Sequence, residues 1–226
     1  EVFTANEASA AGFQTRNVMQ EDFGYEVPVE AVPLPSNGAV YPVESPLYGK
    51  ETVDIRAMTA REEDILTSRA LIKKGTVITH LIRSCLIDKT ISVDEMLVGD
   101  RNAIMTALRV TGYGSEYNAE VDCPACGERS KQEFKLTDLP IKRLEIRPVV
   151  DGANLFGFTL PMTKKKVHFK FLTGDDESNI TVLMERRKKS GSQGESLVTT
   201  RLCHQLVAID GIKDKNKINT FITVSY

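Results

Sequence analysis

Two cysteines separated by two residues are the part of this sequence whose type and spacing could do chemistry. Cys123 and Cys126 lie in the stretch VDCPACGERSKQEF, with a proline and an alanine between them and a glycine directly after. A thiolate pair at this spacing can supply two of the four ligands of a tetrahedral zinc site, and the CPACG form is common in zinc ribbons. The sequence therefore predicts Cys123 and Cys126 as candidate zinc ligands.

Two other interpretations of the pair stay open. A redox role of the thioredoxin type requires the motif to open a helix after a strand, whereas the residues flanking this pair indicate a hairpin. The remaining interpretation is a turn that keeps its two cysteines without binding a metal.

The other ligands of a zinc site are not evident from spacing. Candidates elsewhere in the chain are His80, His168, Cys203 and His204, and none of them shows a paired ligand spacing. Cys203 and His204 lie among apolar residues, which favours a core cysteine beside a histidine at the edge of the core, and Cys85 is predicted to be a packing residue. If zinc binds, we expect its remaining ligands to come from polypeptide outside this sequence or from another subunit.

No signature of catalysis accompanies the cysteine pair. The sequence lacks the phosphate-binding GxxxxGK[ST] loop, the HExxH motif and the GxSxG nucleophile turn. The acidic pairs Glu62–Glu63 and Asp175–Asp176 fall in predicted first helical turns, where carboxylates interact favourably with the helix dipole. The sequence predicts no catalytic residue, no enzymatic activity and no small-molecule substrate.

The composition is that of a globular protein that binds neither nucleic acid nor membrane. The 226 residues are 41% hydrophobic and 27% charged, and the formal net charge is −2. Nucleic-acid binders neutralise phosphates with an excess of basic residues, and a membrane span needs about 18 consecutive apolar residues. Four cysteines, two of them isolated, differ from a secreted disulfide framework and indicate folding in a reducing cytosol.

The sequence predicts an α+β fold in four segments. A cluster of five prolines between Val27 and Pro46 predicts an extended segment, because proline cannot donate a backbone hydrogen bond. After it the apolar spacing becomes helical, and around the cysteines it becomes alternating. The segments are an extended proline-rich arm (1–50), a helical subdomain (51–115), a zinc-ribbon-like β-hairpin (116–140) and a second α+β section (141–226).

Local signals place the individual elements. Thr59 and Glu62 form a capping box that predicts a helix ending at Gly75, and Asp100 is predicted to cap a later long helix. The further predictions are a helix over 77–86, strands on both sides of the cysteine turn, strands within 154–160 and 166–173, a helix over 175–189 capped by Thr173, a loop over 190–196, and a helix over 196–207.

Several of these stretches together resemble one protein family. PLPSNGAVYP, DIRAMTAREEDILTSRALIKKGTV, LIRSCLIDK, MLVGDRNAIMTALRVTGYGSEY and CPACGE follow one another in this order. The series is similar to the T4-type bacteriophage baseplate hub protein family of contractile-tailed phages. The resemblance covers roughly Pro33 to Leu136 and continues more weakly through FLTGDDE and VAIDG.

The resemblance implies a structural component of the tail baseplate, at the hub or next to it, that acts by protein–protein assembly. Its implied partners are other baseplate or tail proteins in a symmetric assembly of several copies, and its implied location is the virion, after assembly in the host cytoplasm. It further implies a natural chain that continues past Tyr226 and carries a second cysteine turn there. Alternative functions are a baseplate assembly chaperone absent from the mature virion and a cytosolic zinc-ribbon adaptor protein.

Overall fold

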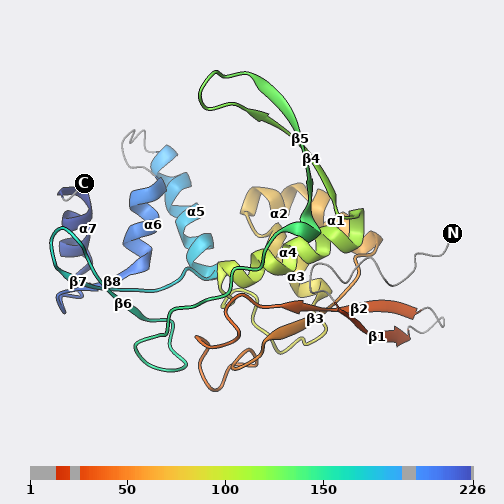
Figure 1. Ribbon diagram of the computed structural model, residues 1–226, viewed down its shortest axis with the longest axis horizontal. Helices are drawn as coiled ribbons and strands as arrows, with labels where there is room; N and C mark the ends of the chain where they lie inside the picture. The colour runs from red at the N-terminus through yellow and green to blue at the C-terminus, as the bar shows by residue number, and fades with distance from the viewer. Residues whose placement is uncertain (1–13, 21–25, 190–196, 225–226) are drawn as a thin grey trace.

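The computed structural model describes residues 14–20, 26–189 and 197–224, and their fold is α+β (Figure 1). Helices and three small antiparallel sheets alternate along these residues, so the predicted fold class is confirmed. The predicted loop over 190–196 lies outside the described residues. In the described ranges no helix has the length and apolar character needed to cross a membrane.

The elements follow one another in three groups, each with its own sheet. The strands are β1 (Gln14–Gln20), β2 (Glu26–Pro33), β3 (Thr52–Arg56), β4 (Glu116–Asp122), β5 (Arg129–Lys135), β6 (Phe156–Thr159), β7 (Lys166–Phe169) and β8 (Leu206–Ile209). The helices are α1 (Ala60–Thr67), α2 (Arg69–Lys74), α3 (Val77–Cys85), α4 (Val98–Tyr113), α5 (Gly174–Lys189), α6 (Leu197–Gln205) and α7 (Lys215–Val224), with a 3₁₀ turn at Leu136–Asp138.

The main hydrophobic core lies between the first sheet and helices α3 and α4. Strand β2 is central in this sheet and pairs antiparallel with β1 and with β3. Both helices turn an apolar side toward the sheet, as the helical spacing of their apolar residues predicts. The most deeply buried residues of this core include Val32, Leu34, Leu47, Ile55, Leu81, Ile82, Met96, Ile104 and Leu108.

The proline-rich segment contributes to this core, which corrects its description as an extended arm. From Val29 to Leu47 it supplies several buried side chains, including those of Leu34 and Tyr41. Its prolines end β2 and shape the turns that follow, so the chain stays close to the helices. The sequence showed little periodicity here because turns carry most of the buried residues. The division into four segments stays a prediction.

Asp100 fastens the proline-rich segment to helix α4. Its fully buried carboxyl group accepts hydrogen bonds from the Ser36 amide at 3.0 Å, from the Ser36 hydroxyl at 2.6 Å and from the Tyr41 hydroxyl at 2.6 Å. Burial and the neighbouring carboxyl of Asp100 raise the pKa of Tyr41, so its hydroxyl stays a donor. The predicted role of Asp100 as a helix cap is wrong, because Leu97 occupies the cap and Asp100 lies inside the first turn.

Glu62 connects strand β3, the start of helix α1 and helix α3. Its buried carboxylate accepts from Arg56 of β3 at 2.7 and 3.1 Å, from the Thr59 amide at 2.8 Å and from the Ser84 hydroxyl of α3. Burial alone would raise the pKa of Glu62, but the hydrogen bonds from Arg56, Ser84 and Thr59 outweigh it and hold the pKa well below its ordinary value of 4.5. The predicted capping box is therefore present. Its glutamate, Glu62, also makes the tertiary contacts with Arg56 and Ser84.

The C-terminal part has a smaller core of its own. Strand β7 lies between β6 and β8, and helices α6 and α7 cover a cluster of Val167, Ile209, Ile218 and Ile222. Phe156 connects this part to the main core, because its ring packs against those of Phe169 and Phe171 with centroids 5.6 and 4.9 Å apart. In Figure 1 helices α5 to α7 accordingly lie on one side of α4, away from β1 and β2.

Two local predictions needed correction, and one helix was not expected. The helix expected from Thr59 to Gly75 is divided at Ser68, whose backbone is extended, although Gly75 ends it in the predicted left-handed conformation. The helix expected over 196–207 ends at Gln205, because Leu206 begins β8 and pairs with β7. The last stretch of the chain forms α7, which the sequence did not indicate.

Replacing Leu81 by alanine should lower the free energy of unfolding by about 2–5 kcal/mol, because the change leaves a cavity among fully buried neighbours. Urea denaturation followed by circular dichroism measures the loss. Ile72→Ala, at a residue of α2 that is 57% exposed, is the control and should stay within about 0.5 kcal/mol. A loss below about 0.5 kcal/mol for Leu81→Ala would contradict the described core.

Asp100→Ala should cost roughly 2–5 kcal/mol, because the donors of Ser36 and Tyr41 are left buried without an acceptor. Tyr41→Phe should cost less, and the double variant should show a coupling of about 0.5–3 kcal/mol in a double-mutant cycle. Asp94→Ala removes a partly exposed ion pair with Arg83 and should stay within about 1 kcal/mol. Additive losses for Asp100 and Tyr41 would contradict their direct contact.

The stability of the protein should fall with acidification in a way that depends on Glu62. A carboxyl whose pKa is lowered by folding stabilises the native state above its unfolded pKa, near 4.5, and this contribution is lost as the pH falls toward the folded pKa. Glu62→Gln should lower stability at pH 7 and flatten the slope of unfolding free energy below about pH 5. The exposed Asp64→Asn control should keep the wild-type slope. An unchanged slope in Glu62→Gln would refute the assignment.

Candidate functional site

The two predicted zinc ligands lie at the tip of the β4–β5 hairpin. The strands pair in continuous register from Glu116 with Lys135 to Asp122 with Arg129, so residues 123–128 form the turn. The Cys123 amide donates to the Glu128 carbonyl at 2.9 Å, and the Gly127 amide donates to the Cys123 carbonyl at 2.8 Å. Gly127 has a φ of 73°, which a residue with a side chain adopts only with strain. The predicted hairpin, with the cysteine turn at its tip, is confirmed.

The turn favours the thiolate form of Cys123. The backbone amides of Cys126 and Ala125, and then the Cys126 thiol, donate toward the Cys123 sulfur and lower its pKa. Backbone amides stabilise a negative sulfur in the same way that they stabilise other anions. Both thiols are free, with Cys123 partly exposed and Cys126 exposed. The turn therefore presents two sulfur ligands to solvent at one point.

The other candidate ligands lie elsewhere in the fold. His80 is on α3, His168 is on β7, and Cys203 and His204 are on α6. The Cys203 thiol lies 3.2 Å from the Asn219 side-chain oxygen, and His204 faces a carboxylate of α5. Across the described ranges no group of three or more histidine, cysteine, aspartate or glutamate side chains could hold a metal ion. Among the described residues, the turn therefore brings together two candidate zinc ligands, Cys123 and Cys126, without a third.

The faces of the hairpin are largely uncovered. Figure 1 shows β4 and β5 leaving the helical part of the molecule and extending away from it. Tyr117, Val121 and Phe134 are 45%, 44% and 47% exposed, and Tyr117 lies directly opposite Phe134 in the register. A two-stranded hairpin with an uncovered apolar face is only marginally stable by itself in water. This element is therefore suited to bind another polypeptide.

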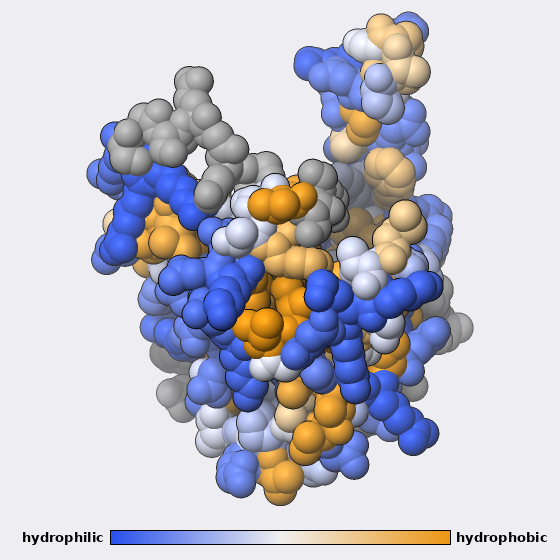
Figure 2. All heavy atoms as spheres, turned by 90° about the vertical axis from the view of Figure 1, so that its left-hand side faces the viewer, coloured by the Kyte–Doolittle hydropathy of each residue, from blue (hydrophilic) through white to orange (hydrophobic). Residues whose placement is uncertain are grey.

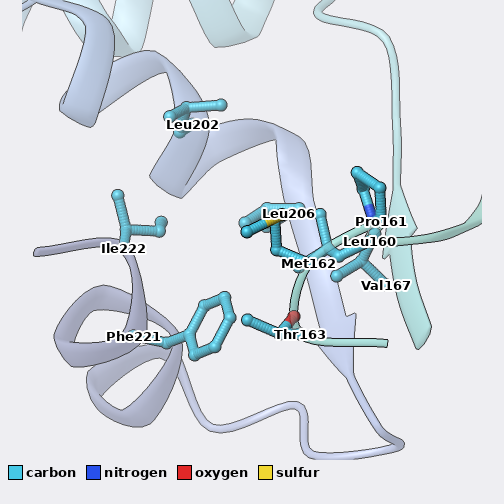
Figure 3. Close-up of a pocket in the computed structure, with 9 residues that line it drawn as sticks. All are labelled: Leu160, Pro161, Met162, Thr163, Val167, Leu202, Leu206, Phe221 and Ile222. Carbon is cyan, nitrogen blue, oxygen red and sulfur yellow. The ribbon is translucent and has the colours of Figure 1, made fainter. Parts of the chain in front are cut away.

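Two further apolar surfaces lie on the body of the molecule. The irregular segment after β5 exposes Leu139, Ile141, Ile146, Val149 and Val150. Beside the C-terminal part, a hollow of about 280 Å³ is lined by residues of the β6–β7 loop, α6, β8 and α7, among them Met162, Leu206 and Phe221. Figure 2 shows hydrophobic residues gathered near the middle of this side of the molecule, and Figure 3 shows the side chains that line the hollow.

A cleft rich in basic residues was not indicated by the sequence. It has a volume of about 800 Å³ and is lined by residues that include Arg56, Arg61, Arg83 and Lys89. Arg56 binds Glu62, Arg83 pairs with Asp94, and Lys89 donates to two backbone carbonyls. These four cations come from β3, α1, α3 and a loop, so their spacing in the sequence does not indicate that they lie together. Arg56, Arg83 and Lys89 each have a structural partner.

One family of known proteins matches the chain. The family described as T4 bacteriophage base plate protein matches residues 39–185, which is well over half of the chain. The matched region runs from the proline-rich segment through the hairpin into α5. Comparison with curated proteins and with solved structures gives no significant match.

Proposed function

The chain belongs to the T4 bacteriophage base plate protein family, and we propose that within the baseplate it is a structural component of the hub or of the parts next to the hub. Membership supports a structural role in the phage tail and interaction with other tail or baseplate proteins. It also suggests a role that is not enzymatic. The family match is the observation that carries the proposal.

The surface of the molecule supports a role in assembly. A monomeric protein rarely exposes several apolar patches, whereas a subunit of a larger structure covers such patches with its neighbours. Here the hairpin, the segment over residues 139–150 and the hollow beside α7 each expose apolar side chains. We therefore expect several copies to bind neighbouring baseplate proteins through these surfaces, during assembly in the host cytoplasm and then in the virion.

Purified virions of a phage that encodes this chain test the proposal. Quantitative mass spectrometry of isolated tails should find the chain in a fixed ratio to other baseplate proteins, and electron microscopy should place it at the central axis. A chain found in assembly intermediates but missing from virions would instead indicate an assembly chaperone. A chain at the periphery of the baseplate would refute the hub position, and recovery only with host cytosolic proteins would favour the adaptor alternative.

Variants of the hairpin connect this test to the structure. Tyr117→Ser with Phe134→Ser should leave the melting temperature of the isolated protein nearly unchanged, because both residues are almost half exposed. The same pair should lower incorporation into tails at least several-fold, since an interface loses its aromatic anchors. Val43→Ser, at a residue that is 67% exposed away from the hairpin, is the control. Normal incorporation of the double variant would show that the face of the hairpin with Tyr117 and Phe134 contacts no partner.

A further inference from the structure

We propose that Cys123 and Cys126 form half of a tetrahedral zinc site, and that the same two cysteines of a second copy of this chain complete it. A structural zinc site uses four ligands, and four cysteine thiolates are one of its usual sets. Each chain brings two such thiols to a single turn. The inference concerns the hairpin alone and does not rest on the proposed hub position.

The turn is already arranged as one half of such a site. Its backbone is fixed by the hydrogen bonds between Cys123 and Glu128 and between Gly127 and Cys123. The described residues of the same chain offer no third ligand for this turn.

The shape of the molecule favours completion from outside. Figure 1 shows that the turn lies at the far end of the hairpin, which extends well beyond helices α1 to α4. In this arrangement the body of the same chain does not cover the thiols. A second molecule can reach them without a collision between the two bodies, since each hairpin carries its own turn away from its body.

A second copy fits this position better than an unrelated partner, because it is known to carry a matching pair. A two-fold axis through the metal would give each zinc the same two cysteines from both chains, which is the usual symmetry of a homodimer. Arg129 pairs within its own chain with Asp122 at 2.9 Å and Glu120 at 3.7 Å, which limits the repulsion between two like tips.

The chemistry of binding is an exchange of protons for metal. Four thiols release their protons to solvent, the four sulfurs bind one Zn²⁺, and no oxidant or reductant takes part. Oxidation of Cys123 and Cys126 to a disulfide would consume both ligands, so the site requires reducing conditions.

Zinc titration of the 226-residue chain under a non-thiol reductant tests the inference. Metal analysis should give about one zinc for every two chains, and light scattering should show the mass doubling from 25.1 kDa as zinc is added. A chelator should return the monomer. Cobalt in place of zinc should give the thiolate charge-transfer and visible bands of a tetrahedral four-sulfur site.

Serine variants identify the ligands. Cys123→Ser and Cys126→Ser should each abolish zinc-dependent doubling and reduce bound zinc to near zero, while the melting temperature without metal stays unchanged. Cys203→Ser alters another partly exposed cysteine and should bind zinc and dimerise as the wild type does. The variants therefore separate loss of ligands from loss of folding.

Other outcomes would overturn the proposal. One tightly held zinc in a chain that stays monomeric would place the missing ligands within one molecule. Dimerisation by zinc that persists in Cys123→Ser would assign the metal to other residues. Absence of zinc from reduced protein would leave a hairpin that keeps its cysteines without a metal. None of these results depends on whether the chain is found in phage tails, so failure of this inference and failure of the hub proposal are separate findings.

Discussion

The buried carboxyl group of Asp100 is the contact on which the main unit of this protein depends. A carboxyl group without water is costly unless its oxygens accept hydrogen bonds, and here Ser36 and Tyr41 supply three of them. Tyr41 in turn accepts from the Leu97 amide at 2.9 Å, and the Ser36 hydroxyl accepts from Gly38. The satisfied network therefore fixes the proline-rich segment, the start of α4 and the loop before it in one arrangement, and the first sheet packs against α3 and α4 within that frame.

In this arrangement the β4–β5 hairpin contributes no buried residue to the main core. The main core takes its buried residues from the first sheet, the segment after it, α3 and α4, and it connects through Phe156 to the C-terminal part. The hairpin begins directly after α4, yet nearly all of its residues are exposed. The hairpin adds little to the stability of its own chain, but it carries a defined turn and an apolar face. It can therefore bind another protein without disturbing the rest of the fold. That separation suits a subunit of a baseplate.

The sequence was informative where structure is decided locally. The hairpin, the capping box at Thr59, the helix cap at Thr173 and the helix end at Gly75 depend on residues within a few positions of one another, and each is present. Asp100 was misjudged because its partners lie 64 and 59 residues away in the chain, and the same side chain could equally have capped a helix. Likewise, prolines indicate extended backbone but not whether it lies at the surface or against a core. The sequence identified the cysteine pair for its chemistry, whereas its isolation at the end of a projecting hairpin is a property of the tertiary structure.

The proposed zinc site and the uncovered face of the hairpin are both related to the low stability of a two-stranded hairpin in water. A two-stranded hairpin gains little from its own strand pairing, so order at its far end depends on what binds there. Zinc held by two thiolates of one chain would leave two positions to water and bind weakly, whereas four thiolates from two chains give a closed site. In the proposed site, the free energy of closing the coordination shell becomes available only when two chains meet. Metal binding and ordering of the hairpin turn would then occur as one cooperative step of assembly.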